Sequence, residues 1–374
     1  MQNILVFYGG KSVEHDISVI TAIQTLKNIN TEKYNVIPIY QTRENEFVVV
    51  KDYLNPKVYC DKVKNYKKVE FVFGKSEIKI KGLIKKTYKI DCAINCLHGL
   101  NGEDGTLSAL MNLCNIPISS SGLLGSSVCM DKILMKDIFK ANNIPCVEYT
   151  YLTNNDYEKS KKDCLNNIEN KMKFPVIVKP SNLGSSIGIT KANNMQELED
   201  ALDIAFCYDK RVIIEKCLEN FKEINISCLG NEDCDLSSLE QPINWQDFLN
   251  FENKYQNNNE TKTKILNPNL NNNVIEKIKS LSKQMFKIFD LSGVVRIDFM
   301  VDEQNNVFVN EINTVPGSLA FYLWKDKNIE FFELIDKLIV LAKEKHEQNK
   351  LHKYNFSSTV LQDYKENQLN KYSK

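Results

Sequence analysis

Four polar side chains in the C-terminal third of the chain have a spacing that could form a metal site. Arg296 and Asp298 are two residues apart in one apolar run, and Glu311 and Asn313 are two residues apart in the next. If both runs are strands, each pair shares one face, because successive side chains point to opposite faces. Their oxygens suit Mg²⁺, which is often held by one or two carboxylates and by substrate phosphates. The alternative is a solvated sheet face with an ordinary Arg–carboxylate pair.

A second candidate site lies near the middle of the chain. Lys179 ends an apolar run that begins at Phe174, and the Gly/Ser loop 184–188 follows. A lysine at a strand end can meet a phosphate as a point charge, and a glycine-rich loop exposes N–H groups to phosphate oxygens. An ordinary flexible loop is the alternative. The chain has no Walker A loop and no Gly-x-Gly-x-x-Gly motif after its first strand.

Two further segments cannot be interpreted from their own residues. Lys132 falls on a predicted helix, where a lysine is usually a solvated surface residue. Residues 213–218 are either the end of a strand or an adenine-binding segment.

A third candidate site lies near the N-terminus. Glu14 follows Gly9 and Gly10, where a predicted strand leads into a helix, and His98 comes at the end of another apolar run. The carboxyl ends of parallel strands are where α/β proteins bind ligands. The alternative for Glu14 is a first-turn glutamate that the helix dipole favours.

The elements that would position these residues differ between the two halves of the chain. In the first ~120 residues, strands and helices alternate, which predicts an open parallel α/β domain. Its predicted strands are 3–8, 34–40 and 90–97, with a helix at about 12–27. Residues 45–82 alternate only weakly and are interpreted as a peripheral insertion.

The remaining residues predict an α+β arrangement. Predicted helices are 126–142, 195–207, 274–289 and 328–348; predicted strands are 174–179, 212–215, 223–230, 293–301 and 306–312, the last two as a hairpin. Residues 246–273 are Asn-rich and without pattern, and a loop of this length is usually functional or disordered. The residues beyond 348 form a polar tail.

Composition excludes several classes of protein. The 48 basic and 48 acidic residues balance, which argues against a protein held to nucleic acid by a basic face. No apolar run is long enough to span a membrane, and the N-terminus reads as a strand and not as a signal peptide. Eleven scattered cysteines without a Cys-x-x-Cys motif suit a reducing cytosol, so a cytoplasmic location is expected. Only three of the basic residues are arginines: Arg43, Arg211 and Arg296.

Taken together, the motifs resemble the D-alanine–D-alanine ligase family of the ATP-grasp superfamily. The resemblance runs from residue 1 to about 345. It is carried in order by residues 9–18, 98–106, 130–132, 179–188, 215–218, 254–255, 296–298 and 311–317. The resemblance implies an ATP-grasp fold preceded by the open parallel α/β domain. The expected domains are 1–121, 122–215 and 216–347, the last with a lid at 246–273, followed by the tail 348–374.

The resemblance assigns a nucleotide site to residues already singled out. Lys132 and Lys179 would hold the ATP phosphates, with Ser185 and Ser186 in the loop that closes over them. The other expected ATP contacts are the Lys216 and Leu218 backbone and Glu215 at the adenine, Glu223 at the ribose, and Lys254. Asp298, Glu311 and Asn313 resemble the ligands of two Mg²⁺ ions, with Mn²⁺ as an alternative.

The family's reaction has two steps. ATP phosphorylates the carboxylate of a first D-amino acid, and the amine of a second then attacks this acyl phosphate. By resemblance, Glu14 takes the first ammonium and joins Ser185 and Tyr255 in a hydrogen-bonded triad. Arg296 and the Gly317 N–H would hold the oxyanion. His98 and Ser318 are further expected substrate contacts.

The chain departs from the family pattern where the second substrate should bind. After Gly317 the family usually continues to a Ser-Leu pair that reads that substrate's carboxylate, whereas residues 318–324 here are mostly apolar and aromatic. Three functions therefore stay open: ligation of two D-alanines for peptidoglycan, ligation of D-alanine to another acceptor such as D-serine, or nucleotide binding by a regulator without catalysis. Tyr255 favours an amino-acid acceptor. Small-molecule substrates and a homodimer are the expected partners, with neither nucleic acid nor membrane.

Overall fold

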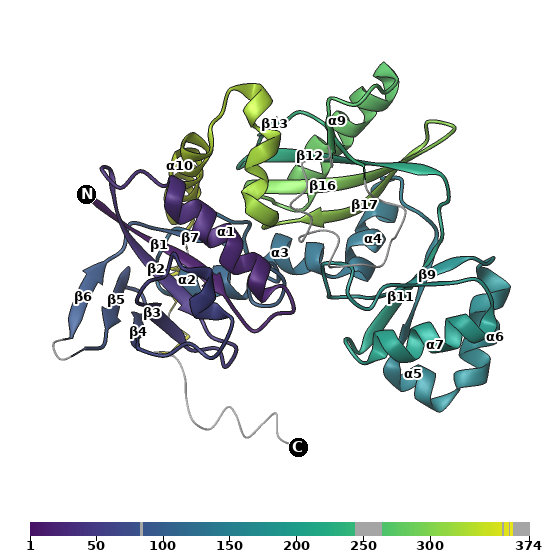
Figure 1. Ribbon diagram of the computed structural model, residues 1–374, viewed down its shortest axis with the longest axis horizontal. Helices are drawn as coiled ribbons and strands as arrows, with labels where there is room; N and C mark the ends of the chain where they lie inside the picture. Colours follow the sequence, from purple (N-terminus) through teal and green to yellow (C-terminus); the bar gives the residue numbers. More distant parts are fainter. Residues whose placement is uncertain (83–84, 244–263, 354, 359, 362–374) are drawn as a thin grey trace.

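The fold is described from a computed structural model of the chain. It describes residues 1–82, 85–243, 264–353, 355–358 and 360–361. Three sheets account for the strands, one from each successive part of the chain, as Figure 1 shows from purple through teal to green. In the described residues no helix is both long and apolar enough to cross a membrane.

The N-terminal sheet is mixed and not wholly parallel. Its order is β6-β5-β4-β3-β2-β1-β7, and only β2, β1 and β7 pair in parallel. The strands are β1 (Gln2–Gly9), β2 (Tyr34–Gln41), β3 (Phe47–Val50), β4 (Tyr66–Val72), β5 (Glu77–Ile80), β6 (Lys86–Lys89) and β7 (Cys92–Asn95). The interpretation of 45–82 as a peripheral insertion is wrong, because β3, β4 and β5 extend this sheet by antiparallel pairing. The predicted parallel unit is confirmed for its three strands.

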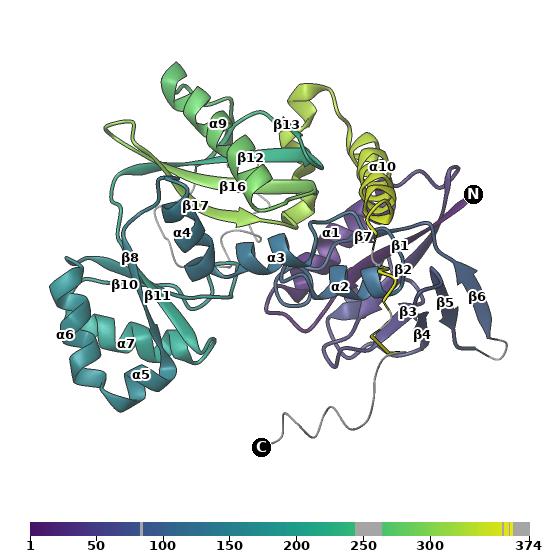
Figure 2. The ribbon, with the colours of Figure 1, turned by 180° about the vertical axis from the view of Figure 1, so that it is seen from behind.

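Alternation along β1 separates two apolar cores. Ile4, Val6 and Tyr8 face one core, whereas Leu5 and Phe7 face the other. The first core includes helix α1 (His15–Asn28) and the C-terminal helix α10 (Phe331–Lys350), and the second includes α2 (Thr106–Leu113). Figures 1 and 2 show α10 beside the N-terminal sheet, so the end of the described chain returns to its beginning.

The central sheet has the order β10-β9-β11-β8. Its strands are β8 (Tyr149–Thr153), β9 (Val176–Pro180), β10 (Thr190–Ala192) and β11 (Arg211–Lys216), and its helices are α5 (Asn154–Lys159), α6 (Lys161–Lys171) and α7 (Met195–Phe206). The helices pack their apolar residues against the sheet in one cluster. Lys179 and Glu215 therefore come from neighbouring strands.

The third sheet carries the predicted hairpin. Its order is β15-β14-β12-β16-β17, with β13 beside β12. The strands are β12 (Phe221–Gly230), β13 (Cys234–Leu236), β14 (Glu240–Pro242), β15 (Lys264–Leu266), β16 (Gly293–Asp302) and β17 (Val307–Asn313). Helix α9 (Asn272–Ile288) buries the predicted apolar face against it.

Two expectations for this half are corrected. Residues 264–273 do not belong to an unpatterned loop, since β15 and the start of α9 lie there; residues 244–263 fall outside the described part. The helix expected at 126–142 is two helices, α3 (Leu123–Met130) and α4 (Lys132–Ala141). The break is at Asp131, whose side chain accepts from the N–H groups of Ile133 and Leu134 and caps α4.

Short helical turns complete the chain. They are η1 (Pro56–Tyr59), η2 (Gly317–Leu323) and η3 (Lys325–Lys327). Trp324, between η2 and η3, is buried in the first core, and its indole Nε1 donates to Ser227 Oγ at 3.1 Å. The apolar residues that depart from the family pattern therefore anchor the third sheet to the N-terminal domain.

Candidate active site

Strands β16 and β17 bring together the four polar residues expected there. Arg296 lies opposite Asn313 in the ladder. Asp298 lies opposite Glu311, so the predicted pairing is confirmed. Arg296 Nε and Nη2 donate to the two Asp298 oxygens at 2.7 and 2.8 Å, and Asn313 Nδ2 donates to Asp298 Oδ2 at 2.9 Å. Burial alone would lower the pKa of Arg296, but Asp298 raises it, so the guanidinium stays charged.

A carboxyl group of the N-terminal domain, Glu103, lies close to Glu311 of this hairpin. Burial, together with the charge of Glu311, raises the pKa of Glu103 to about 8. The oxygens of Asp298, Glu311 and Asn313 are suited to a hard divalent cation. Among the residues that the structure describes, no group of three or more His, Cys, Asp or Glu side chains could hold a metal ion alone. An ion here would therefore also need amide and substrate oxygens.

Asn225 extends this polar row to the neighbouring strand β12. It lies opposite Asp298 and is buried. With its amide nitrogen turned toward the carboxylates, it donates to Glu223 Oε1 at 3.2 Å and to Asp298 Oδ1 at 3.1 Å. Asn225 thus connects the expected ribose contact with an expected metal ligand. This role could not be predicted from the sequence, because a single polar residue in a strand is common.

A buried cluster of charges lies where the adenine end of the nucleotide is expected. Lys179 Nζ donates to Glu215 Oε2 at 2.7 Å. Lys136 Nζ lies 3.2 Å from Glu215 Oε1, an ion pair without hydrogen-bond alignment. Burial alone would raise the pKa of Glu215, but the two lysines hold it at about 2. Lys136 was not among the predicted site residues, although it lies one helical turn after Lys132.

A pocket lies beside this cluster, where the nucleotide is expected. It has a volume of about 570 Å³ and is lined by residues that include Ile177, Leu218 and Glu223. The Lys216 N–H is already donated to the Glu148 carbonyl at 2.8 Å. An adenine contact at Lys216 would therefore have to use its carbonyl group.

Lys132 is the first residue of α4 and reaches toward the Gly/Ser loop. Its Nζ donates to the Leu183 carbonyl at 2.6 Å, and burial lowers its pKa. Asp131 beside it pairs with Arg211 and accepts from Ser181 Oγ at 2.9 Å. Arg211, whose purpose the sequence did not reveal, thus ties the start of α4 to the central sheet.

The Gly/Ser loop contacts the N-terminal domain through Glu14. Ser185 Oγ donates a hydrogen bond to Glu14 Oε1, so one side of the expected triad is present. A Cβ on Gly184 would lie 2.8 Å from Glu14 Oε2, and this close approach favours glycine there. Burial raises the pKa of Glu14, and Glu103 raises it further. Tyr255 and Lys254 lie outside the described residues.

His98 and Ser318 are joined through a third residue. Thr21 Oγ1 lies 2.9 Å from His98 Nε2 and accepts the Ser318 N–H at 3.0 Å. Burial lowers the pKa of His98, which favours the neutral ring. Ser318, Leu319 and Ala320 have φ angles of 53°, 52° and 49°, a left-handed conformation that costs energy in residues with a Cβ. The segment that departs from the family pattern is therefore also a strained one.

Near Arg296 lie further charged and polar side chains that the sequence did not identify. Lys264 Nζ lies 3.8 Å from the Tyr322 ring centroid and 3.4 Å from Glu240 Oε2. That Glu240 oxygen is buried and makes no hydrogen bond within the described residues. Burial raises the pKa of Tyr322, while the Arg296 charge lowers it. Their distance along the chain from Arg296 explains why no local pattern revealed them.

These segments meet in one recess, lined among others by Glu103, Lys132, Gly184, Glu311 and Asn313. A lysine from the start of α4, a glycine from the loop and carboxylates from two domains thus face the same space. The chemistry of this combination suits phosphates beside a divalent cation and a carboxylate substrate. The recess has a volume of about 20 Å³, so these segments would have to move apart to admit them.

Comparison with known proteins gives the same family at the levels of sequence and fold. Family models described as D-ala D-ala ligase N-terminus and C-terminus match residues 3–121 and 138–340. A D-alanine–D-alanine ligase of Clostridium acetobutylicum is 37% identical over 347 residues, covering 91% of this chain and 98% of that protein. The corresponding ligase of Bacillus velezensis is 34% identical, covering 93% and 100%.

Two solved structures are similar over nearly the whole chain. The D-alanine–D-alanine ligase of Coxiella burnetii superposes with a TM-score of 0.81 at 27% identity, covering 94% of this chain and 96% of that chain. The VanG D-Ala:D-Ser ligase of Enterococcus faecalis has a TM-score of 0.78 at 27% identity, covering 91% and 99%. The similar proteins therefore include D-alanine–D-alanine ligases and one D-Ala:D-Ser ligase.

Proposed function

We propose that this chain, which belongs to the D-alanine–D-alanine ligase family of ATP-dependent ligases, joins two molecules of D-alanine for peptidoglycan synthesis. The single observation that carries the proposal is the common recess of Glu103, Lys132, Gly184, Glu311 and Asn313. It combines groups for a phosphate, a divalent cation and a carboxylate substrate.

The proposed reaction starts with D-alanine held by Glu14. An ionised Glu14 would accept hydrogen bonds from the ammonium group and from Ser185 at the same time. Lys132 and Lys179 are assigned to the phosphates of ATP, with Ser185 and Ser186 covering them. Their charges would offset the negative charge on the phosphoryl group as it moves to the D-alanine carboxylate.

The adenosine contacts follow from the pocket beside β11. Leu218 and Glu223 line it, so they are assigned to the adenine and the ribose. The Lys216 carbonyl and Glu215 are assigned to the adenine amino group, with Glu215 held in place by its two lysines. Lys254 completes the proposed set from outside the described residues.

Asp298, Glu311 and Asn313 are assigned to two Mg²⁺ ions, which Mn²⁺ could replace. Bound there, the ions would neutralise charge on the phosphate oxygens. Arg296 is assigned to the oxyanion that forms when the second amine attacks, together with the Gly317 N–H. Space beside Gly317 supports this, because a Cβ added there meets no atom within 4 Å. Tyr255, on the proposed lid, would join Glu14 and Ser185.

The proposed domains are 1–121, 122–215 and 216–347, with a lid at 246–273 and a tail at 348–374. The proposal includes a cytoplasmic location and a homodimer. The substrates are small molecules, so neither nucleic acid nor a membrane is a proposed partner.

A second candidate is ligation of D-alanine to another acceptor, such as D-serine or a bulkier amino acid. Two observations favour it: Glu240 near Arg296 has a buried oxygen held by an ion pair to Lys264 but by no hydrogen bond in the part of the chain that the structure describes, and residues 318–324 depart from the family pattern. The structural similarity to a D-Ala:D-Ser ligase supports the same possibility. A regulator without catalysis is disfavoured, since the lysine, arginine and carboxylate positions are all retained.

An acceptor screen with phosphate release as the readout distinguishes these candidates. The chain is given ATP, Mg²⁺ and D-alanine, alone or with D-serine or another D-amino acid. Release with D-alanine alone supports the first candidate, and release only with a second amino acid supports the other. Binding of ATP without release for any pair would contradict both.

A further inference from the structure

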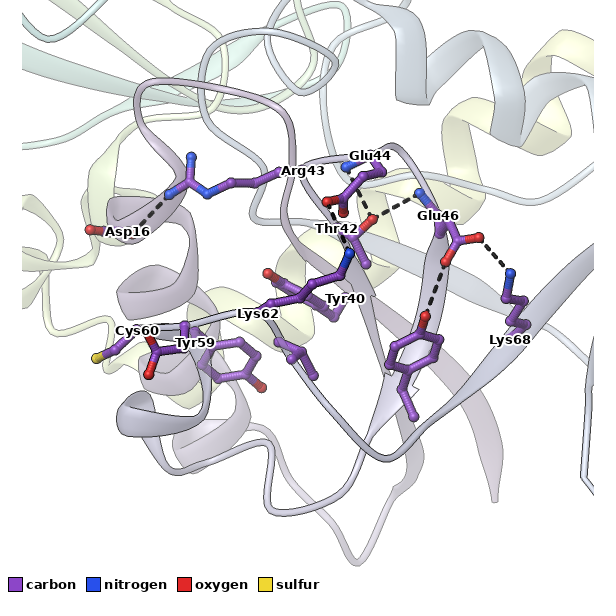
Figure 3. A pocket seen from close by; sticks show the side chains of 13 residues that line it. Asp16, Tyr40, Thr42, Arg43, Glu44, Glu46, Tyr59, Cys60, Lys62 and Lys68 are labelled. Carbon is purple, nitrogen blue, oxygen red and sulfur yellow. Dashed lines mark hydrogen bonds and ion pairs between the residues drawn. The ribbon is translucent and has the colours of Figure 1, made fainter.

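A second cavity lies in the N-terminal domain, away from the recess where the reaction is placed. It has a volume of about 590 Å³, within the range of small-molecule sites. It opens between the turn after β2, at residues 42–46, and the segment 59–63 that follows η1 (Figure 3). Tyr40 and Tyr59 are buried side chains in its wall, and their ring centroids are 5.1 Å apart. The proposed reaction uses none of these residues.

Charged side chains of both signs stand around the rim. Arg43 Nη2 lies 3.6 Å from Asp16 Oδ1, and Lys62 Nζ lies 3.7 Å from Glu44 Oε1. Both pairs are too long for direct hydrogen bonds. The side chains of Arg43 and Lys62 are 59% and 79% exposed. Such exposed pairs contribute little to stability, so their members can change partners at small cost.

We propose that this cavity binds a short peptide with a free ammonium group and a free carboxylate. The planar guanidinium of Arg43 can take the carboxylate through two parallel hydrogen bonds. Glu44, on the same turn, can take the ammonium group in place of Lys62. The tyrosine rings offer an apolar wall for the body of the peptide. A ligand with one positive and one negative charge suits this rim, because the rim offers both a guanidinium and carboxylates.

The cavity is connected to the loop that carries Glu14. Tyr40 Oη lies 3.3 Å from His15 Nε2, and His15 Nδ1 lies 2.8 Å from the Gly10 carbonyl oxygen. A Cβ on Gly9 would lie 2.5 Å from the Tyr40 ring, so the ring packs directly on this loop. A peptide that contacts Tyr40 would therefore also change the surroundings of the His15 ring, which is next to Glu14 in the sequence.

Calorimetric titration of the full chain with tri-L-alanine tests the site without any catalysis. Two analogues, one N-acetylated and one C-amidated, each lack one charge. Arg43→Gln should weaken tri-L-alanine binding about fivefold but leave the amidated form unchanged, because the latter has no carboxylate to lose. Lys81→Gln, which removes a surface lysine paired with Glu70 outside this cavity, is the matched control and should change neither.

The four histidines provide an independent readout by NMR of their ring signals. Tri-L-alanine should move the His15 signal and leave that of His346, on α10, in place. No saturable binding in the millimolar range would overturn the proposal. The proposal would also be overturned if Arg43→Gln weakened the binding of tri-L-alanine and of its amidated form equally. A shift of the His98 signal in place of the His15 signal would overturn it as well, because the peptide would then occupy the reaction site. Unchanged melting of Arg43→Gln verifies its fold.

Discussion

The proposed nucleotide end and the proposed acceptor end of the site differ in how their charges are paired. At the nucleotide end, Glu215 is buried between Lys136 and Lys179 and all three charges have partners. At the proposed acceptor end, Glu240 is buried but pairs with one lysine, Lys264 at 3.4 Å, whose side chain is 43% exposed, and the turn at Ser318 is strained. The buried pairs hold the side chains of the first region in one arrangement. The second combines a partly exposed ion pair with backbone strain, and such strain clusters where ligands are bound.

Arg296→Lys should have the largest effect, because Arg296 stands between the two regions. Lysine cannot reproduce the two-pronged contact with Asp298 or the donor assigned to the oxyanion. Turnover should fall by about 10²–10³-fold, while ATP affinity changes less than about twofold. Steady-state kinetics and nucleotide titration measure the two quantities. Arg43→Lys is the matched control and should keep full turnover; wild-type turnover in Arg296→Lys would refute the role of Arg296.

Lys136→Met tests whether the nucleotide end depends on its buried pairing. Glu215 would lose one of its two ionic partners in a fully buried place, which should lower the free energy of unfolding by about 3–4 kcal/mol. Adding Glu215→Gln should restore part of this loss, since the unpaired charge is then removed. Denaturant unfolding measures both. Lys162→Met, at an exposed position on α6, should have almost no effect. Equal loss in both lysine variants would contradict the comparison.

The same cluster predicts a dependence of stability on pH. The pKa of Glu215 is about 2 in the folded chain and near 4.5 as its ordinary value. Because the folded value is lower, the stabilisation is present above pH 4.5 and is lost as the pH falls from 4.5 toward 2. The loss should reach about 3 kcal/mol for this one group. The free energy of unfolding, measured from about pH 5 down toward pH 2, should therefore depend less on pH in Glu215→Gln than in the original chain. Identical slopes would show that Glu215 is not held by its lysines.

Ser318→Gly probes the acceptor end and should have the smallest effect. Glycine adopts the left-handed conformation of residue 318 without a steric cost, so the variant should be more stable by about 1 kcal/mol. If strain there supports acceptor selection, the KM for the second amino acid should rise while that for ATP is unchanged. Thermal melting and acceptor kinetics measure the two effects. A less stable variant would argue against stored strain in this turn.

Local patterns in the sequence predicted the parts of the site that lie within one element. Period two placed Arg296 and Asp298 on a common face, and the paired strand was close enough in sequence to predict as a hairpin. The strand end at Lys179 and the loop at Ser185 were predicted for the same reason. The roles of Tyr255 and Lys254 stay predictions.

The features that could not be predicted from the sequence depend on contacts between residues that are remote in the chain. The helix break at Asp131 coincides with a cap and with an ion pair to Arg211, which is 80 residues away in the sequence on strand β11. Lys136 is an ordinary helical lysine until β11 brings Glu215 beside it. The extension of the N-terminal sheet by β3 required its pairing with β2, which its weak alternation did not reveal. In each case the decisive partner is remote in the chain.

The most direct test of the central claim is the product formed from ATP, Mg²⁺ and D-alanine as the only amino acid. Mass spectrometry of the products, together with phosphate release, should give one D-alanyl-D-alanine for each phosphate. Phosphate release without dipeptide, or dipeptide formation only when another amino acid is added, would contradict ligation of two D-alanines by this chain.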